Sequence, residues 1–141
     1  MTDAPRLTLI DFENWERKEH YAHFMNEVRC SYSVCVNLDI TPLNGQRLYP
    51  AMLWLLTRTV NEMPEFRTAL TEDGLGYFSE MHPAYTVFNR DTKTFSGIWT
   101  AYQPDYPSFL HGYEEDVGKY SFSTQYEPKP GRPANSFDVS M

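Results

Sequence analysis

The sequence has 141 residues, of which 41% are hydrophobic and 16% aromatic, and it carries a formal net charge of −7. This size suits one globular domain with its own core, and the aromatic content argues against a disordered chain. The acidic balance argues against nucleic acid or an anionic membrane as partner, and no apolar run has the length of a signal peptide or a spanning helix. We therefore expect a single cytoplasmic domain over residues 1–141.

The first half of the chain predicts strands and helices in alternation. A short strand is expected at residues 7–12, and Asn14 is the expected N-cap of a helix over residues 15–28. Residues 30–39 alternate strictly between apolar and polar side chains, which predicts a strand with one buried face. A loop at 42–45 leads into the strongest helix, residues 48–63, whose start Pro50 marks because proline fits only the first turn.

The second half predicts short strands, one helix and a long loop. Strands are expected at residues 67–70, 75–78, 84–89 and 94–102, with Asp73 and Gly74 forming a hairpin turn. A helix is expected at 105–120, a proline-rich loop at 121–136, and the start of a strand at 137–141. Because most strands form one contiguous run among the helices, we expect an α+β fold. A domain rarely ends just inside a strand, so we expect the chain to be a fragment.

No segment spells out a complete catalytic or metal site. Cys30 and Cys35 lie on opposite faces of the predicted strand, which is poor geometry for a disulfide. Two reduced thiols are the simpler interpretation, and a cysteine that touches a ligand is the alternative. Zinc-type spacings, phosphate loops and nucleophile elbows are absent from the sequence, so no metal is expected. The histidines, which lack an orienting partner nearby in sequence, are interpreted as ordinary surface or packed residues: His20, His23, His82 and His111.

A set of short motifs, taken together, resembles the chloramphenicol acetyltransferase family. They begin with Asn-Trp-Glu-Arg-Lys-Glu-His-Tyr at residues 14–21 and continue with Leu-Asp-Ile-Thr at 38–41 and Leu-Tyr-Pro-Ala at 48–51. The segment at 61–67 resembles the family's Asn-x-x-Pro-Glu-Phe-Arg, residues 82–88 match His-Pro-x-Tyr-Thr-Val-Phe, and residues 94–96 match Thr-Phe-Ser. The motifs occur in the family's order and cover nearly the whole chain, so together they are specific.

The resemblance implies a two-layer α+β sandwich of the CoA-dependent acyltransferase type, incomplete at its C-terminus. It also implies an acetyl-CoA-dependent O-acetyltransferase that acts on chloramphenicol or a similar hydroxyl compound, as in antibiotic resistance. In such enzymes, which are homotrimers with each active site at a subunit interface, a histidine removes the proton of the acceptor hydroxyl. A serine hydroxyl then stabilises the oxyanion that forms on the thioester carbonyl.

Residue by residue, the resemblance implies a pocket and part of the catalytic machinery. The residues that resemble the family's antibiotic pocket are Phe24, Cys30, Tyr32 and Phe95. Aromatic residues at these positions are also compatible with a plain core role, which periodicity alone does not separate from ligand binding. Ser140 resembles the oxyanion serine, and Arg17 resembles a structural arginine that pairs with an aspartate of the catalytic motif.

The chain departs from the family in one respect that bears on activity. The family's His-His-x-x-x-Asp-Gly motif, which supplies the general base and the partner of Arg17, does not occur in the sequence. Three hypotheses remain open: an inactive fragment of an acetyltransferase, a non-catalytic binding module of that ancestry, and a degenerate remnant that does not fold stably. Whether the chain is an enzyme, which acceptor it serves and what oligomer it forms are left open by the sequence.

Overall fold

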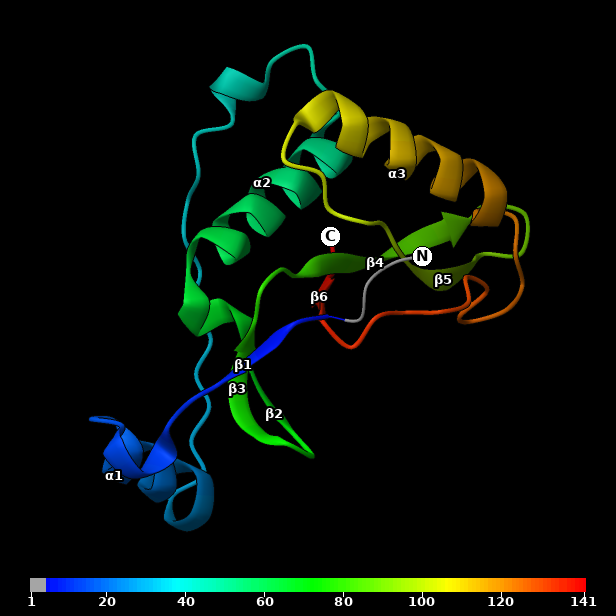
Figure 1. Cartoon of the computed structure of the whole chain (residues 1–141). Coiled ribbons are helices and arrows are strands. Elements are labelled where there is room, and N and C mark those ends of the chain that lie inside the picture. The colour runs from blue at the N-terminus through cyan, green and yellow to red at the C-terminus, as the bar shows by residue number, and fades with distance from the viewer. Residues whose placement is uncertain (1–4) are drawn as a thin grey trace.

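The computed structural model describes residues 5–141, and within them it contains three α-helices and two separate three-stranded sheets (Figure 1). One sheet has the strand order β1-β3-β2 and the other has the order β5-β4-β6. All neighbours are antiparallel except β4 and β6, which run parallel. The strands are β1 (Leu7–Leu9), β2 (Thr68–Thr71), β3 (Gly74–Phe78), β4 (His82–Asn89), β5 (Thr94–Trp99) and β6 (Ser136–Val139).

Two long helices, α2 (Leu48–Glu62) and α3 (Tyr106–Tyr120), pack side by side over β4 and β5 (Figure 1). Both agree with the predicted helices to within two residues. Asp105 caps α3, because its carboxylate accepts a hydrogen bond from the backbone amide of Ser108 at 2.9 Å. The core is formed where these helices meet the sheet, and its buried members are Leu53, Tyr85, Val87, Ile98, Phe109 and Tyr113.

The smaller sheet depends on two glycines of β3. The predicted hairpin forms one residue earlier than expected, with Glu72 and Asp73 in the turn, and Gly74, the first residue of β3, has φ +124°, a value that L side chains rarely adopt. At Gly76, a Cβ atom would lie 2.6 Å from the carbonyl oxygen of Thr8 on β1. Only glycine therefore lets β1 approach β3 in the observed register.

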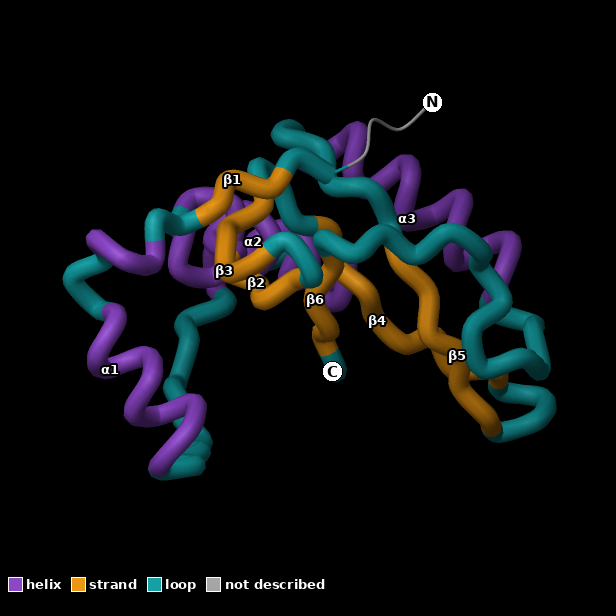
Figure 2. The backbone as a smooth tube through the Cα atoms, turned by 60° about the horizontal axis from the view of Figure 1, so that its bottom comes forward, coloured by secondary structure: helices purple, strands orange, loops and turns teal. Residues whose placement is uncertain are grey.

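The first helix is shorter and starts later than predicted. It comprises α1 (Lys18–Ala22), which continues as a π-helical turn at His23–Glu27. Asn14 is not its N-cap, because the Asn14 side chain donates to the carboxylate of Asp11 at 2.7 Å instead of accepting from a helix amide. The predicted N-cap was therefore wrong, and Arg17 holds that position. Figure 2 shows α1 set apart from the pair of long helices.

The predicted strand at residues 30–39 is also wrong as a sheet element. Residues 28–40 are extended but belong to neither of the sheets that the structure describes between residues 5 and 141. The apolar face that we expected to be buried is open to solvent, with Tyr32 89% and Val34 73% exposed. The alternation of side chains is real, but a strand also needs a neighbour for its backbone N–H and C=O groups, and the local pattern does not supply one.

The loop at 121–135 is irregular, as predicted, and it covers the outer edge of β5. The backbone N–H of Gly97 donates to the carbonyl of Tyr126 at 2.6 Å, and the Ser96 hydroxyl donates to the carbonyl of Gln125 at 2.6 Å. This backbone contact satisfies groups that an edge strand would otherwise expose. Helices and strands both build the fold, as the α+β class requires, and the two-layer acyltransferase sandwich remains a prediction.

Candidate functional site

Ser140 lies at the junction of two cavities. It follows β6 directly, and β6 runs parallel to β4 with Val139 in register with Tyr85. On one side is a cavity of about 630 Å³, which we call the aromatic cavity. On the other side is a cavity of about 300 Å³ between the sheet and the loop at 126–132, which we call the loop cavity. Thr86 of β4 also lines both.

The aromatic cavity brings together two of the predicted site residues, Phe95 and Ser140. Its aromatic lining residues come from α2, β4, β5 and α3, and they are Tyr49, Phe88, Phe95 and Tyr113. Phe95 is 54% exposed, so its ring is available to a ligand as well as to its edge-on neighbour Tyr126, 5.9 Å away between centroids. The residue types suit an aromatic compound with a hydroxyl group.

Two tyrosine side chains in the wall of the aromatic cavity are held in fixed positions. The Tyr49 hydroxyl donates to the carbonyl of Thr86 at 2.7 Å, and its ring lies edge-on to Tyr85 and Tyr113. Burial raises the pKa of Tyr49 and of Tyr113 above the ordinary tyrosine value, so both stay protonated at neutral pH. They shape the cavity and are not candidates for a general base. Neither Tyr49 nor Tyr113 is among the pocket residues predicted from the sequence, although both line the aromatic cavity.

Phe24 and Arg17 lie elsewhere, in an apolar groove of about 660 Å³ between α1 and the strands β2 and β3. We call this the α1 groove. Trp15, Tyr21 and Tyr77 contribute aromatic rings to it, and His20 also lines it. The ion pairs found among residues 5–141 do not include Arg17. The structure therefore separates Phe24 from Phe95 within a single chain.

Cys30 and Tyr32 lie on the exposed segment at 28–40. Both cysteines are free thiols and exposed, and neither Cys30 nor Tyr32 lines the aromatic cavity or the α1 groove. The predicted pocket residues thus fall into three places: the aromatic cavity, the α1 groove and an uncovered extended segment. One chain alone does not bring them together.

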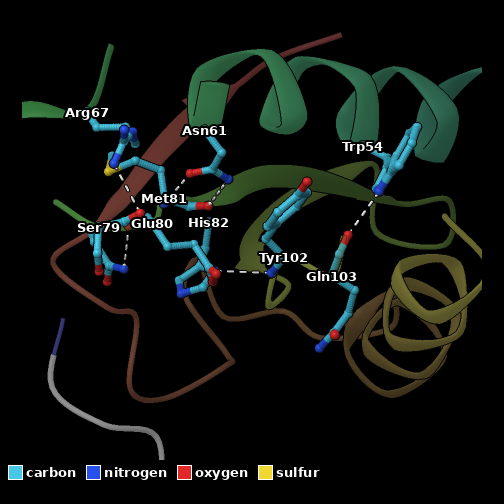
Figure 3. A network of polar contacts seen from close by, with 10 residues as sticks. Trp54, Asn61, Arg67, Ser79, Glu80, Met81, His82, Tyr102 and Gln103 are labelled. Carbon is cyan, nitrogen blue, oxygen red and sulfur yellow. Dashed lines mark hydrogen bonds and ion pairs between the residues drawn. The ribbon is translucent and has the colours of Figure 1, made fainter. Parts of the chain in front are cut away.

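No histidine lines either cavity beside Ser140, as far as residues 5–141 are described. His23 pairs with Glu27 and His111 with Glu115 on helix surfaces. His82 is the partly buried member of the set: its Nδ1 accepts the backbone N–H of Tyr102 at 3.1 Å, and burial lowers its pKa (Figure 3). In that role His82 supports the backbone beside α2 and is not placed to act on a ligand.

The polar residues around His82 form a structural network (Figure 3). Asn61 of α2 exchanges two hydrogen bonds with the backbone of Met81, at 3.0 and 2.7 Å. Arg67 donates to the carbonyls of Phe78 and Ser79. These residues belong to the motifs at 61–67 and 82–88, and their contacts join α2 to the turn between β3 and β4.

No group of three or more histidine, cysteine, aspartate or glutamate side chains between residues 5 and 141 is placed to hold a metal ion. None of the helices in this range is long and apolar enough to cross a membrane.

Comparison with known proteins agrees with the motifs. A family model described as chloramphenicol acetyltransferase matches residues 6–141. A Clostridium perfringens protein named chloramphenicol acetyltransferase is 44% identical over 96% of this chain, which spans 65% of that protein's length. A Campylobacter coli protein of the same name is 45% identical over 96% of this chain and 67% of its own length.

A solved structure shows the same fold. A chain titled chloramphenicol acetyltransferase superposes with a TM-score of 0.74 at 21% identity, covering 86% of this chain and 60% of its own length. The chain spans about two thirds of the length of the curated relatives it matches. With a family model over residues 6–141 and relatives above 40% identity, the chain belongs to the chloramphenicol acetyltransferase family.

Proposed function

We propose that this chain supplies the acceptor-binding and oxyanion-binding part of an acetyl-CoA-dependent O-acetyltransferase that acts on chloramphenicol. The observation that carries the proposal is the position of Ser140, between an aromatic cavity and a second cavity, in a chain whose relatives bear that name. An acceptor in the aromatic cavity and a thioester reaching Ser140 from the loop cavity would meet at this hydroxyl.

The chemistry assigned to these residues follows from their types. The acceptor hydroxyl loses its proton to a base and attacks the thioester carbonyl, which forms a C–O bond and a tetrahedral oxyanion. The Ser140 hydroxyl donates a hydrogen bond to that oxyanion. Collapse of the intermediate breaks the C–S bond, and the proton passes to the CoA thiolate. Phe95, Tyr49 and Tyr113 orient the aromatic acceptor and exclude water.

The general base in this proposal comes from outside the 141 residues. No histidine is available beside Ser140 in the described range, and the curated relatives are longer than this chain. Because Arg17 is unpaired in the ion pairs of the described residues, we assign it an aspartate partner from the same outside segment. The homotrimer, the two-layer sandwich, the single domain over residues 1–141 and a cytoplasmic location belong to this proposal.

The test compares the chain alone with a chimaera that adds the C-terminal third of the C. perfringens relative. We expect no thiol release from acetyl-CoA by the 141-residue chain, because it lacks a base, and chloramphenicol-dependent release by the chimaera. In the chimaera, Ser140→Ala should lower kcat by about 100-fold or more, the usual cost of losing one oxyanion donor. Ser136→Ala, in the preceding strand β6, is the control and should leave kcat nearly unchanged. Acetylation by the chain alone, or an unaffected S140A chimaera, would contradict the proposal.

A non-catalytic binding module is the second candidate, and the histidine-free walls of the aromatic cavity favour it. In that case the 141-residue chain binds chloramphenicol, Phe95→Ala weakens binding severalfold, and the chimaera shows no turnover. Equilibrium dialysis with radiolabelled chloramphenicol measures the binding, and Phe122→Ala, an exposed aromatic outside the cavity lining, is the control.

A further inference from the structure

A largely buried ion pair links the loop before β6 to helix α3. The Nζ atom of Lys129 lies 2.6 Å from Oδ1 of Asp116, and each of the two side chains is only 16% exposed. Every other ion pair of the described residues has at least one partner whose side chain is 44% exposed or more. Taking two charges out of water costs free energy, so such a pair persists only when its other hydrogen bonds are also satisfied.

The surrounding hydrogen bonds meet that condition. The second carboxylate oxygen of Asp116 accepts from the Thr100 hydroxyl at 2.7 Å, and Thr100 is in turn 2.7 Å from the hydroxyl of Tyr85. Lys129 also donates to the carbonyl of Trp99 at 2.8 Å, and its ammonium lies 4.1 Å from the centroid of the indole. The network therefore joins the loop, α3, β5 and β4 through polar contacts that depend on one another.

The network ends beside the strand that carries Ser140. Tyr85 is in register with Val139, the residue before Ser140, and the loop cavity is lined by Tyr85, Trp99, Lys129 and Ser140 together. β6 has only four residues and pairs with β4 in the parallel sense, which is the less stable arrangement per residue. The start of β6 is held separately, because the backbone N–H of His82 donates to the carbonyl of Asn135.

We propose that Lys129, held by Asp116, is a positioning residue for Ser140: it fixes the loop and, through Tyr85, the end of β6 on which the hydroxyl stands. That the position of Ser140 matters for activity rests on the function proposed above. That Lys129 and Asp116 hold the loop and the end of β6 in place does not depend on that function. Arg132 contacts the same strand through Ser136 and Asp138, yet its side chain is 39% exposed and exposed pairs hold strands weakly.

The test follows β6 directly by NMR on the 15N-labelled chain. In Lys129→Met, we expect amide hydrogen exchange in β6 to accelerate about tenfold or more, since removing one partner leaves Asp116 buried and unpaired. The Ser140 amide resonance should shift at the same time. Amides of α2 should change much less, and Lys129→Arg should restore most of the protection. Lys119→Met is the matched control, since Lys119 is an exposed lysine of α3.

A double variant keeps the proposal testable if Lys129→Met unfolds the chain. Asp116→Asn combined with Lys129→Met removes both charges, which is often nearly neutral for stability. We expect this variant to melt close to the wild type while β6 exchange stays fast. Equal acceleration in α2 and β6, or unchanged β6 exchange in a folded variant, would overturn the positioning role. Neither readout needs a ligand, so failure of chloramphenicol binding or of Ser140 chemistry would be seen separately in the chimaera.

Discussion

At the scale of single residues, His82 shows how burial changes the chemistry of a side chain. Its sequence neighbours gave no orienting partner, but the fold places its Nδ1 against the backbone N–H of Tyr102. That hydrogen bond requires an unprotonated Nδ1. Burial lowers the pKa of His82 below its ordinary value, and the nearby carboxylate of Glu80, 3.7 Å away, opposes the shift only in part.

The lowered pKa of His82 determines how the stability of the folded chain depends on pH. The unfolded chain takes up a proton at His82 near the ordinary pKa of 6.5, and the folded chain does so only at lower pH. The stability that the folded chain gains from neutral His82 is therefore fully present above pH 6.5 and is lost as the pH falls below that value. We expect His82→Asn, which keeps an acceptor near the Nδ1 position, to remove this dependence of the free energy of unfolding on pH.

Urea unfolding at neutral and mildly acidic pH measures the effect. His111→Asn is the control, because His111 is 75% exposed on α3. This substitution should leave the dependence of the unfolding free energy on pH unchanged. If the free energy of unfolding of the His82 variant depends on pH as strongly as that of the wild type, the prediction is wrong.

At the scale of elements, the extended segment at 28–40 is the part of the fold most in need of a partner. Its even-numbered side chains form a continuous apolar row that includes Tyr32, Val34, Val36 and Leu38, all more than 60% exposed. An extended segment with unpaired backbone groups and an apolar face is a site for pairing with another chain. Cys30 and Tyr32, which were predicted to line the pocket, lie on this exposed segment.

A charge on the apolar row should therefore reduce self-association. We expect the wild-type chain to associate at micromolar concentrations and Val34→Lys to raise the apparent dissociation constant about tenfold or more. Sedimentation velocity over a concentration series measures this. Ser33→Lys adds the same charge on the opposite, polar row and should have a much smaller effect. A wild-type chain that stays monomeric throughout the series would show that this segment does not drive association.

At the scale of the whole molecule, stability is distributed unevenly. The members of the buried core and the residues packed on it lie between Tyr49 and Val139, and none comes from α1 or β1. The N-terminal part meets the rest through the β1–β3 pairing and the α1 groove (Figure 2). Regions with few buried apolar contacts open most readily.

Limited proteolysis should expose this difference. Apart from trimming at Arg6, we expect trypsin to cut first after Arg29, because that residue lies in the exposed segment at 28–40. The fragment that begins at Cys30 retains every member of the core cluster and should still melt cooperatively. Mass spectrometry identifies the cut, and circular dichroism follows the melt. Arg29→Gln should remove this cleavage, whereas a first cut inside α2 or α3 would contradict the uneven distribution.

The sequence by itself determined the elements whose signals are local. The apolar periodicity and first-turn prolines of α2 and α3, the hairpin between β2 and β3 and the loop before β6 all follow from interactions within a few residues, and the structure confirms them. The motifs also identified the family, which the comparisons confirm. In both cases the information lies in the order and spacing of side chains, which requires no knowledge of distant contacts.

Only the tertiary structure decided what depends on partners far away in the chain. It left the 28–40 segment unpaired, separated Phe24 from Phe95, and placed Ser140 between two cavities. It also joined Lys129, from a proline-rich loop, to Asp116 on α3, although no local pattern relates the two. A period-two pattern states which side chains share a face, but burial, strand pairing and ion pairing depend on which distant atoms fill the space opposite, and that is set by packing of the whole chain.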